Sequence, residues 1–144
     1  MENKKLIYIA SSWKNQHAVE MLTAELRAHG HEVASFVENN FGEFAKANQM
    51  GLEEWIQSEG GENAFIFDKA GAMCSDLVIY LGPSGNDAWA EIGAAHASGR
   101  TIFGLWSKGE QVGLMRRMVK RWCTDYKQLL KEVDEYLLGG CKTA

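Results

Sequence analysis

Glu91 is the residue whose surroundings most suggest chemistry. It lies in the stretch GNDAWAEIGAAHASG, where the neighbouring Trp89, Ala90 and Ile92 are apolar. A carboxylate among apolar side chains must be paired, hydrogen-bonded or functional, because an isolated buried charge is costly. A solvated glutamate on a helix is the competing interpretation, and position alone does not separate the two.

Tyr8 and Asp68 are two further candidates. Tyr8 stands within the apolar run KLIYIA, where a buried hydroxyl needs a partner. The hydroxyl could hold or tune the Glu91 carboxylate, or it could bond a backbone carbonyl from the core, and composition favours the second role. Asp68 lies in a helical stretch before another apolar run, where a surface aspartate near a helix start would look the same.

The elements that must position these residues alternate along the chain. Apolar runs, and one alternating run, predict strands at residues 5–10, 31–37, 76–81 and 101–106, with a short fifth strand at 119–123. Helical spacing predicts helices at 14–29, 62–73, 87–98 and 124–138, the last with Thr124 as its N-cap. Residues 38–61 are expected to form a long excursion with helical turns.

Strands that alternate with helices imply a parallel sheet covered on both faces. The 144 residues therefore fit one three-layer flavodoxin-like or Rossmann-like α/β domain over 1–144, with four or five mainly parallel strands and a flexible tail at 139–144. Such sheets bind ligands beyond the carboxyl ends of their strands. If the first strand neighbours the third, residues 11–15 and 82–91 meet there, and the Glu91 helix begins near the end of the Tyr8 strand.

Composition excludes several classes of function. The net charge of −4 is mixed along the chain, which argues against a nucleic-acid partner. No apolar run reaches the roughly 20 residues of a membrane span, and the start lacks a secretory signal, so we expect a cytoplasmic protein. The cysteines and histidines lack metal-ligand spacing, so we expect reduced thiols, no metal and no cofactor; they are Cys74, Cys123, Cys141, His17, His29, His31 and His96.

Three segments resemble the nucleoside 2-deoxyribosyltransferase family. LIYIASSW is similar to the family's opening strand, with Tyr8 and Trp13 at its tyrosine and at the aromatic that follows. Asp68 and Asp76 in FDKAGAMCSDLVIYL match an aspartate eight residues before the one that opens the third strand. AEIGAAHASGRTIFGLW is similar to the segment that carries the family's nucleophile and places Glu91 there.

The resemblance covers about residues 6–106 and, more weakly, the last helix. It implies an enzyme of nucleotide metabolism or salvage that cleaves the N-glycosidic bond of a deoxynucleoside or its 5′-monophosphate. Glu91 would attack the anomeric carbon and form a glycosyl-enzyme intermediate. Asp68 would assist the departing base, Tyr8 would orient Glu91, and Trp13 could pack against the base or sugar. Interception by a second base gives transfer, and interception by water gives hydrolysis.

The resemblance also implies a homo-oligomer, because members of the family complete the pocket from a neighbouring subunit. Trp106, Met115, Met118 and Trp122 are compatible with core or subunit contacts.

Two positions depart from the family pattern. The family's aspartate six residues before the nucleophile is Gly85 here, followed by Asn86 and Asp87. Either Asp87 serves from a shifted position or that base contact is missing. The aromatic three residues after the nucleophile is Ala94. These departures motivate a nucleotide-binding sensor without turnover as one alternative. A TIR-like NAD glycohydrolase is another, suggested by SSWKNQHAVEMLTAELRAHGHEV.

Small polar residues at the strand–helix junctions form a candidate substrate-binding set. Backbone N–H groups at a helix start suit a phosphate, and branches of the family that hydrolyse nucleoside 5′-monophosphates use such loops. Ordinary helix capping is the competing explanation. Arg116, Arg117, Lys120 and Arg121 are interpreted as a solvated face, with phosphate contact as the alternative. The set comprises Ser11, Ser12, Lys14, Asn15, Ser84, Gly85, Asn86 and Asp87, with Ser107 and Lys108 after the fourth strand.

Overall fold

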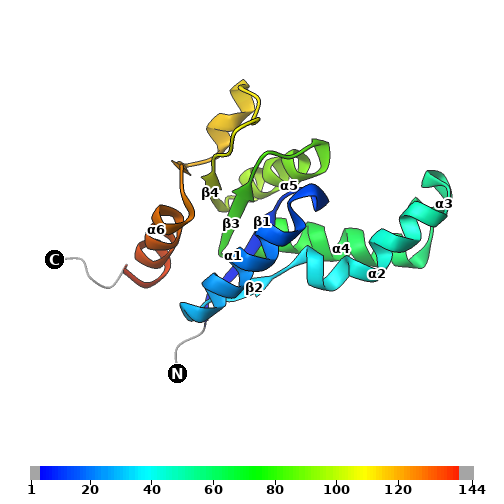
Figure 1. Cartoon of the computed structure of the whole chain (residues 1–144), viewed down its shortest axis with the longest axis horizontal. Helices are drawn as coiled ribbons and strands as arrows, with labels where there is room; N and C mark the ends of the chain where they lie inside the picture. Colours follow the sequence, from blue (N-terminus) through cyan, green and yellow to red (C-terminus); the bar gives the residue numbers. More distant parts are fainter. Residues whose placement is uncertain (1–3, 140–144) are drawn as a thin grey trace.

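A five-stranded, all-parallel sheet forms the centre of the molecule, with strand order β2-β1-β3-β4-β5 (Figure 1). The computed structural model describes residues 4–139, apart from the side chain of Phe44. The strands are β1 (Leu6–Ala10), β2 (Glu32–Ala34), β3 (Leu77–Leu81), β4 (Thr101–Leu105) and β5 (Arg121–Cys123). The first strand pairs with the third, as predicted, and this order is the one found in flavodoxin-like sheets.

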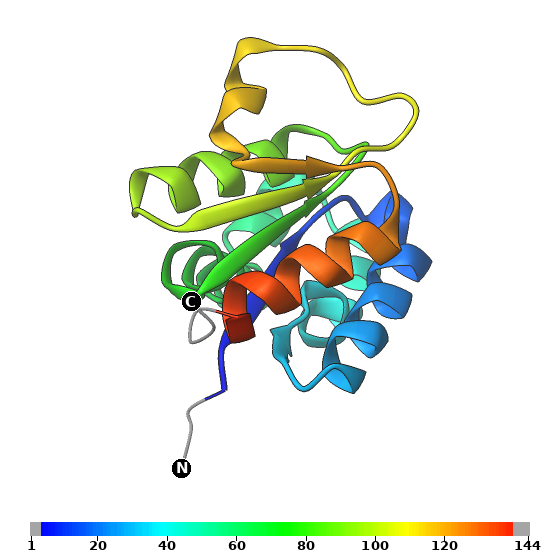
Figure 2. The same ribbon diagram turned by 90° about the vertical axis from the view of Figure 1, so that its left-hand side faces the viewer.

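Helices cover both faces of the sheet (Figure 2). They are α1 (Gln16–Ala28), α2 (Phe36–Gln49), α3 (Leu52–Ile56), α4 (Glu59–Cys74), α5 (Asn86–Ala97) and α6 (Tyr126–Leu138), with 3₁₀ turns η1 (Trp13–Asn15) and η2 (Leu114–Met118). One core packs β1 residues Ile7 and Ile9 against α1 and α6. The other packs Tyr8 and Tyr80 against α4 and α5. The predicted three-layer α/β fold is confirmed.

The second predicted strand is shorter than its sequence pattern indicates. The alternating run over residues 31–37 predicts one strand, but β2 ends at Ala34 and α2 begins at Phe36. Ser35 makes the difference, because its hydroxyl accepts a hydrogen bond from the backbone N–H of Glu38 at 3.4 Å and caps the helix. The expected excursion over residues 38–61 is mostly regular helix, formed by α2, α3 and the start of α4.

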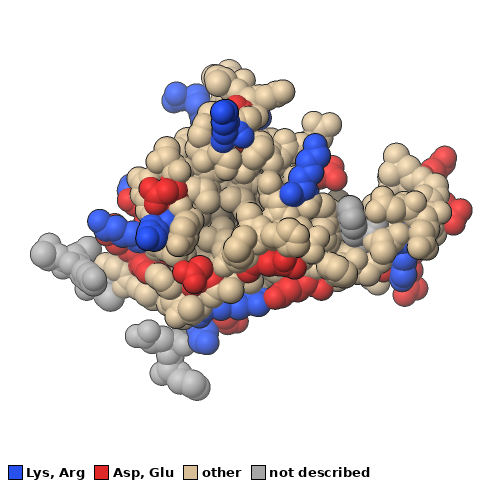
Figure 3. All heavy atoms as spheres, viewed as in Figure 1, with Lys and Arg blue, Asp and Glu red and all other residues tan. Residues whose placement is uncertain are grey.

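The helices α2 and α3 and the N-terminal part of α4 form an arm that extends away from the sheet (Figure 1). Its exposed apolar side chains include Phe41, Leu52, Ile56, Phe65 and Ile66. Figure 3 shows acidic side chains at the far end of the arm, where Glu53 and Glu54 open α3.

The closing helix begins two residues later than predicted. Asp125, and not Thr124, caps α6, because its Oδ1 accepts from the backbone N–H of Gln128 at 2.8 Å. The ambiguous stretch before β5 is a loop containing η2, and we call residues 106–120 the β4–β5 loop. The predicted flexible tail lies outside the described residues, except for Gly139. No helix within residues 4–139 is long and apolar enough to span a bilayer.

The two loops predicted to meet at the carboxyl edge of the sheet do so. The Ser11 hydroxyl donates to the carbonyl of Leu81 at 2.6 Å. The Asn15 amide donates to the carbonyl of Pro83 at 2.8 Å and to the Ser11 hydroxyl at 3.0 Å. These bonds fix the segment before α5 against the end of β1, and α5 carries Glu91.

Candidate functional site

A direct hydrogen bond joins Tyr8 to Glu91. Alternation along β1 turns Tyr8 toward α4 and α5, where its side chain is fully buried. Its hydroxyl donates to Oε1 of Glu91 at 3.0 Å. The sequence suggested two roles for this hydroxyl. The structure shows the bond to Glu91 and not the bond to a backbone carbonyl.

Asp68 approaches the same hydroxyl from α4. The Tyr8 hydroxyl hydrogen-bonds its carboxyl, and the Asn40 amide of α2 donates to its Oδ1 at 3.0 Å. The three predicted catalytic side chains thus converge from β1, α4 and α5. Asn40, which the sequence did not single out, joins them from a fourth element.

Burial dominates the electrostatics of this cluster. It raises the pKa of Glu91 to about 9, with the negative charge of Asp68 adding to the rise and the Tyr8 hydrogen bond opposing it. It raises the pKa of Asp68 to about 6, against the hydrogen bonds from Asn40 and Tyr8. The pKa of Tyr8 is also raised, by burial and by the adjacent carboxylates. The carboxyl pair therefore retains a proton near neutral pH, a condition typical of acid–base sites.

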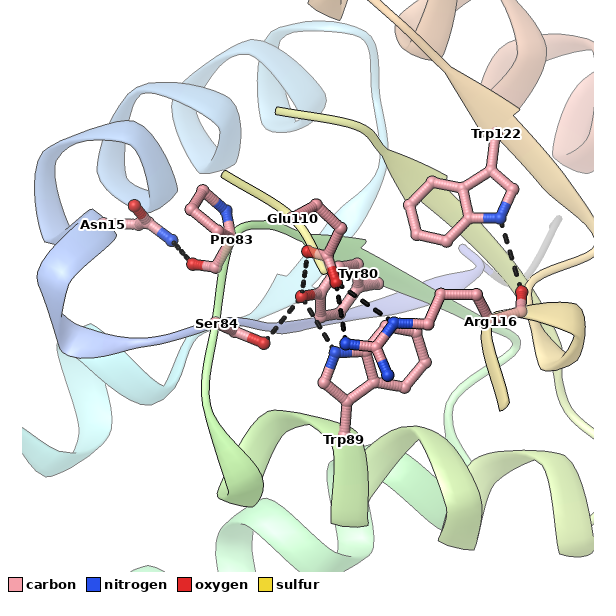
Figure 4. A network of polar contacts seen from close by, with 8 residues as sticks. All are labelled: Asn15, Tyr80, Pro83, Ser84, Trp89, Glu110, Arg116 and Trp122. Atoms are coloured by element: carbon pink, nitrogen blue, oxygen red, sulfur yellow. Dashed lines mark hydrogen bonds and ion pairs between the residues drawn. The ribbon is translucent and has the colours of Figure 1, made fainter. Parts of the chain in front are cut away.

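A second tyrosine–glutamate pair lies at the end of β3 (Figure 4). The Tyr80 hydroxyl donates to Oε1 of Glu110 at 2.5 Å. The Glu110 side chain is 1% exposed, and Arg116 binds its Oε2 through Nε at 3.2 Å and through a terminal nitrogen at 3.0 Å. A Cβ at Gly82 would lie 2.4 Å from Oε1, so the carboxylate fits only because residue 82 is glycine.

This second pair ties the β4–β5 loop to the start of α5. The Trp89 indole N–H donates to the Tyr80 oxygen at 3.0 Å, and the Arg116 guanidinium lies 4.1 Å from the centre of the Trp89 ring. Ser84 bonds the same Tyr80 oxygen at 2.7 Å (Figure 4). Because the Tyr80 proton goes to Glu110, the Ser84 hydroxyl is the donor in that bond. The whole group is a latch, made of Tyr80, Ser84, Trp89, Glu110 and Arg116.

This latch was not predicted from the sequence. Tyr80 and Glu110 are 30 positions apart, and the β4–β5 loop lacks the periodicity that would reveal a buried side. The interpretation of Arg116 as part of a solvated face is wrong, because it is ion-paired and stacked. Arg121 is exposed but ion-paired with Glu132, and Arg117 and Lys120 are exposed as expected.

The predicted substrate-binding residues fall into two groups. Some are hydrogen-bonded within the protein, and others are exposed. The protons of the Ser11 and Ser84 hydroxyls are used within the protein. Ser12 caps η1 by accepting from the Lys14 backbone N–H at 3.1 Å. The exposed group lies at the carboxyl edge of the sheet and comprises Lys14, Gly85, Asn86 and Asp87.

Trp13 is held by aromatic neighbours. Its ring lies edge-on to Phe36 at 5.2 Å and to Phe41 at 6.4 Å, and it packs against the core between the sheet and α1. Its contact with a base or sugar stays a prediction.

The histidines that lack ligand spacing in the sequence are partly brought together. His29 Nδ1 and His31 Nε2 each lie 2.7 Å from an oxygen of Asp134. Within the described residues, no group of three or more histidine, cysteine, aspartate or glutamate side chains is arranged to hold a metal ion. Cys74 and Cys123 are free thiols.

Three solved structures share this architecture. The chain is similar to the CMP N-glycosidase BcmB of Clostridium botulinum (18% identity, 90% of this chain and 99% of that one, TM-score 0.58). It is similar to a conserved protein of Enterococcus faecalis V583 (17%, 94% and 100%, 0.68). It is also similar to a 2-deoxyribosyltransferase of Bacillus psychrosaccharolyticus (21%, 87% and 90%, 0.60). No protein-family model and no curated protein matches the sequence. The chain therefore has the nucleoside 2-deoxyribosyltransferase-like fold, which confirms at the level of fold the resemblance in its sequence.

Proposed function

We propose that this protein cleaves or transfers the N-glycosidic bond of a nucleoside or deoxynucleoside through a covalent glycosyl-Glu91 intermediate. The observation that carries the proposal is the Tyr8–Glu91 hydrogen bond of 3.0 Å, with the Asp68 carboxyl on the same tyrosine hydroxyl. A nucleophilic carboxylate, a second carboxyl group and a group that orients the first are the parts that glycosidic cleavage requires.

In the first step the ionised Glu91 carboxylate attacks the anomeric carbon. The bond from that carbon to the base nitrogen breaks, and its electron pair leaves with the base. Asp68 in its acid form gives its proton to the base. The Tyr8 hydroxyl holds the attacking carboxylate in place. The carboxyl pair retains a single proton near neutral pH, and because the pKa of Glu91 is the higher of the two, that proton must pass from Glu91 to Asp68 before this step.

In the second step the sugar leaves Glu91. Water or the nitrogen of a second base attacks the anomeric carbon, and the ester bond to Glu91 breaks with its electron pair returning to the carboxylate. Asp68, now ionised, takes the proton of the attacking group. Both carboxyl groups return to their starting states, so hydrolysis and transfer differ only in the acceptor.

The contrast between the two tyrosine-bonded glutamates supports the choice of Glu91. Glu110 has Arg116 as its counter-ion, so its charge is neutralised within a structural latch. No lysine, arginine or histidine in the described part of the chain forms an ion pair with Glu91, and the charges that shift its pKa are those of two acids, Asp68 and Asp87. A buried carboxylate kept without a cation is a functional-site candidate.

Asp87 is proposed as the residue that serves in place of the family's missing aspartate. Its negative charge raises the pKa of both Asp68 and Glu91, so it acts on the same pocket from the first turn of α5. Gly85, which occupies the family's aspartate position, is exposed and has open space where a side chain would be. This arrangement supports a base contact from Asp87 and weighs against a sensor that has lost it.

The committed hydroxyl groups favour an unphosphorylated substrate over a 5′-monophosphate. A phosphate needs donors, and the protons of Ser11 and Ser84 already go to Leu81 and Tyr80, which leaves the exposed Lys14 as a charged donor at this edge. The charge of Arg116 is satisfied by Glu110. The acids of the pocket add negative charge, which opposes binding of a second anion.

A homo-oligomer is also part of the proposal. The arm exposes several large apolar side chains on α2, α3 and α4, and exposed apolar side chains gathered on neighbouring helices support an interface. Light scattering coupled to gel filtration would give the mass in solution. A mass of 16.1 kDa at micromolar concentration would contradict this part of the proposal.

The test of the function is chromatographic detection of free base. The protein is incubated with deoxynucleosides, ribonucleosides, their 5′-monophosphates and NAD, each with and without an acceptor base. We expect release from nucleosides that is lost in Glu91→Gln and kept in the matched surface variant Glu135→Gln. Nicotinamide release from NAD alone would point to the TIR-like alternative. Ligand binding without any release would support the sensor.

A further inference from the structure

Asn40 of α2 is the one neutral donor from another helix on the Asp68 carboxyl among the described contacts. Its side chain is almost entirely buried, at 6% exposure, and its Nδ2 donates to Asp68 Oδ1 at 3.0 Å. A hydrogen bond from a buried amide to a carboxylate is stronger than the same bond at the surface, because water does not compete for either partner.

The orientation of this amide is fixed by its neighbour. Asn39 Nδ2 donates to Asn40 Oδ1 at 2.7 Å, so the Asn40 oxygen is already occupied as an acceptor. The N–H groups of Asn40 must then point the other way, toward Asp68. The Ser35 cap fixes the start of α2 one turn earlier, so the helix holds this donor in place.

The titratable groups that face Asp68 from other elements are Asp87, Glu91 and Tyr8. Asp87 of α5 opposes the ionised form by its negative charge, Glu91 of α5 has the higher pKa and keeps its proton while Asp68 ionises, and the Tyr8 hydroxyl of β1, which bonds Asp68, also donates to Glu91. Asn40 is therefore the described contact that favours the Asp68 carboxylate and is not shared with another acid. It binds Oδ1 of that carboxyl.

We propose that Asn40 is a positioning residue that holds the Asp68 carboxyl for proton exchange with the leaving base and favours its ionised form between the two steps. The inference rests on the proposed glycosidic function for its catalytic consequence. The contact itself is independent of that function.

The experiment compares Asn40→Ala and the isosteric Asn40→Asp with the surface control Asn48→Asp, which adds the same charge farther along α2. The Asp68 titration is followed by carboxyl carbon NMR, assigned with Asp68→Asn. Loss of the donor should raise the pKa of Asp68 by about one unit, a tenfold change in proton affinity. Asn40→Asp should raise it further, and Asn48→Asp should leave it unchanged.

Activity then tests the catalytic role. In Asn40→Ala, kcat should fall about tenfold with KM within about twofold, and the limb of the pH–rate profile that follows the Asp68 titration should move to higher pH. An unchanged Asp68 titration in folded Asn40→Ala and Asn40→Asp would overturn the inference. A shifted titration together with no base release by the unaltered protein would overturn the proposed function and the catalytic part of the inference, and would leave the contact established.

Discussion

The Tyr8 hydroxyl donates to Oε1 of Glu91 across 3.0 Å, although the two residues are 83 positions apart in the chain. β1 is flanked by β2 and β3, so Tyr8 cannot move away from this bond without disturbing the sheet. α5 supplies the carboxylate from the layer above. A rigid strand thus fixes the position of a carboxylate that has no counter-ion among residues 4–139, and this arrangement is what a nucleophile requires.

Replacing Tyr8 by phenylalanine removes a hydrogen bond that lowers the pKa of Glu91. The pKa of Glu91 should therefore rise, and the limb of the pH–rate profile that follows the Glu91 titration should move to higher pH because the nucleophile must be ionised. We expect kcat to fall about tenfold, the equivalent of one good hydrogen bond. Tyr136→Phe, which removes an exposed bond to Thr101, is the control. The same pH–rate profile in both variants would contradict the role of Tyr8.

Glu91→Gln should change how stability depends on pH. The folded pKa values of Glu91, about 9, and Asp68, about 6, lie above their unfolded values of 4.5 and 3.8. The folded state therefore binds protons more tightly. The stabilisation that comes from this tighter proton binding is complete below about pH 4 and is lost as pH rises through the folded pKa values.

The free energy of unfolding of the unaltered protein should consequently decline from about pH 5 to pH 9. Glu91→Gln removes the largest part of that decline. Its advantage over the unaltered protein should grow with pH and exceed about 1.4 kcal/mol, the equivalent of one pKa unit. Urea unfolding at pH 5, 7 and 9 measures it, and parallel pH curves for the two proteins would refute a buried, uncompensated Glu91.

Arg116→Met should destabilise the protein through the latch. The Glu110 carboxylate, 1% exposed, would lose its counter-ion, and an unpaired buried charge costs about 3 kcal/mol. Adding Glu110→Gln should recover part of this loss, because the remaining amide carries no charge. The exposed Arg117→Met is the control. Denaturant titration gives the three free energies, and an Arg116→Met effect no larger than that of Arg117→Met would argue against the latch.

Two glycines near α5 should differ in their response to alanine. A Cβ at Gly82 would lie 2.4 Å from Glu110 Oε1 and 2.9 Å from the Tyr80 ring, so Gly82→Ala should cost about 1–3 kcal/mol. At Gly85 nothing lies within 4 Å, and the backbone is extended, so Gly85→Ala should be close to neutral. Melting temperatures of the two variants separate them, and equal losses would speak against steric exclusion at Gly82.

The sequence predicted those parts of the molecule that depend on local pattern. Continuous apolar runs located β1, β3 and β4, because strands buried on both faces carry no polar alternation. Tyr8 and Glu91 were recognisable as polar groups in apolar surroundings. β2 was overextended because residues 31–37 alternate as a strand would, while a single serine cap decides that the chain turns into a helix.

The partners of the buried polar groups could not be predicted in the same way. Asn40 meets Asp68 across 28 positions, and Glu110 meets Tyr80 across 30. Both contacts arise from the packing of separate elements and have no local signature. Arg116 looked solvated because its neighbours in the chain are basic, whereas its surroundings in space are Glu110 and Trp89.

The central claim, that Glu91 carries the sugar, is tested most directly by trapping the intermediate. A 2′-fluoro-2′-deoxynucleoside slows both steps, because the fluorine destabilises the positive charge that develops on the sugar. Intact-mass spectrometry after rapid quenching should show one added fluorodeoxyribosyl group, and peptide mapping should place it on Glu91, with none on Glu91→Gln. Base release by the unaltered protein with no adduct, retained in Glu91→Gln, would contradict the account.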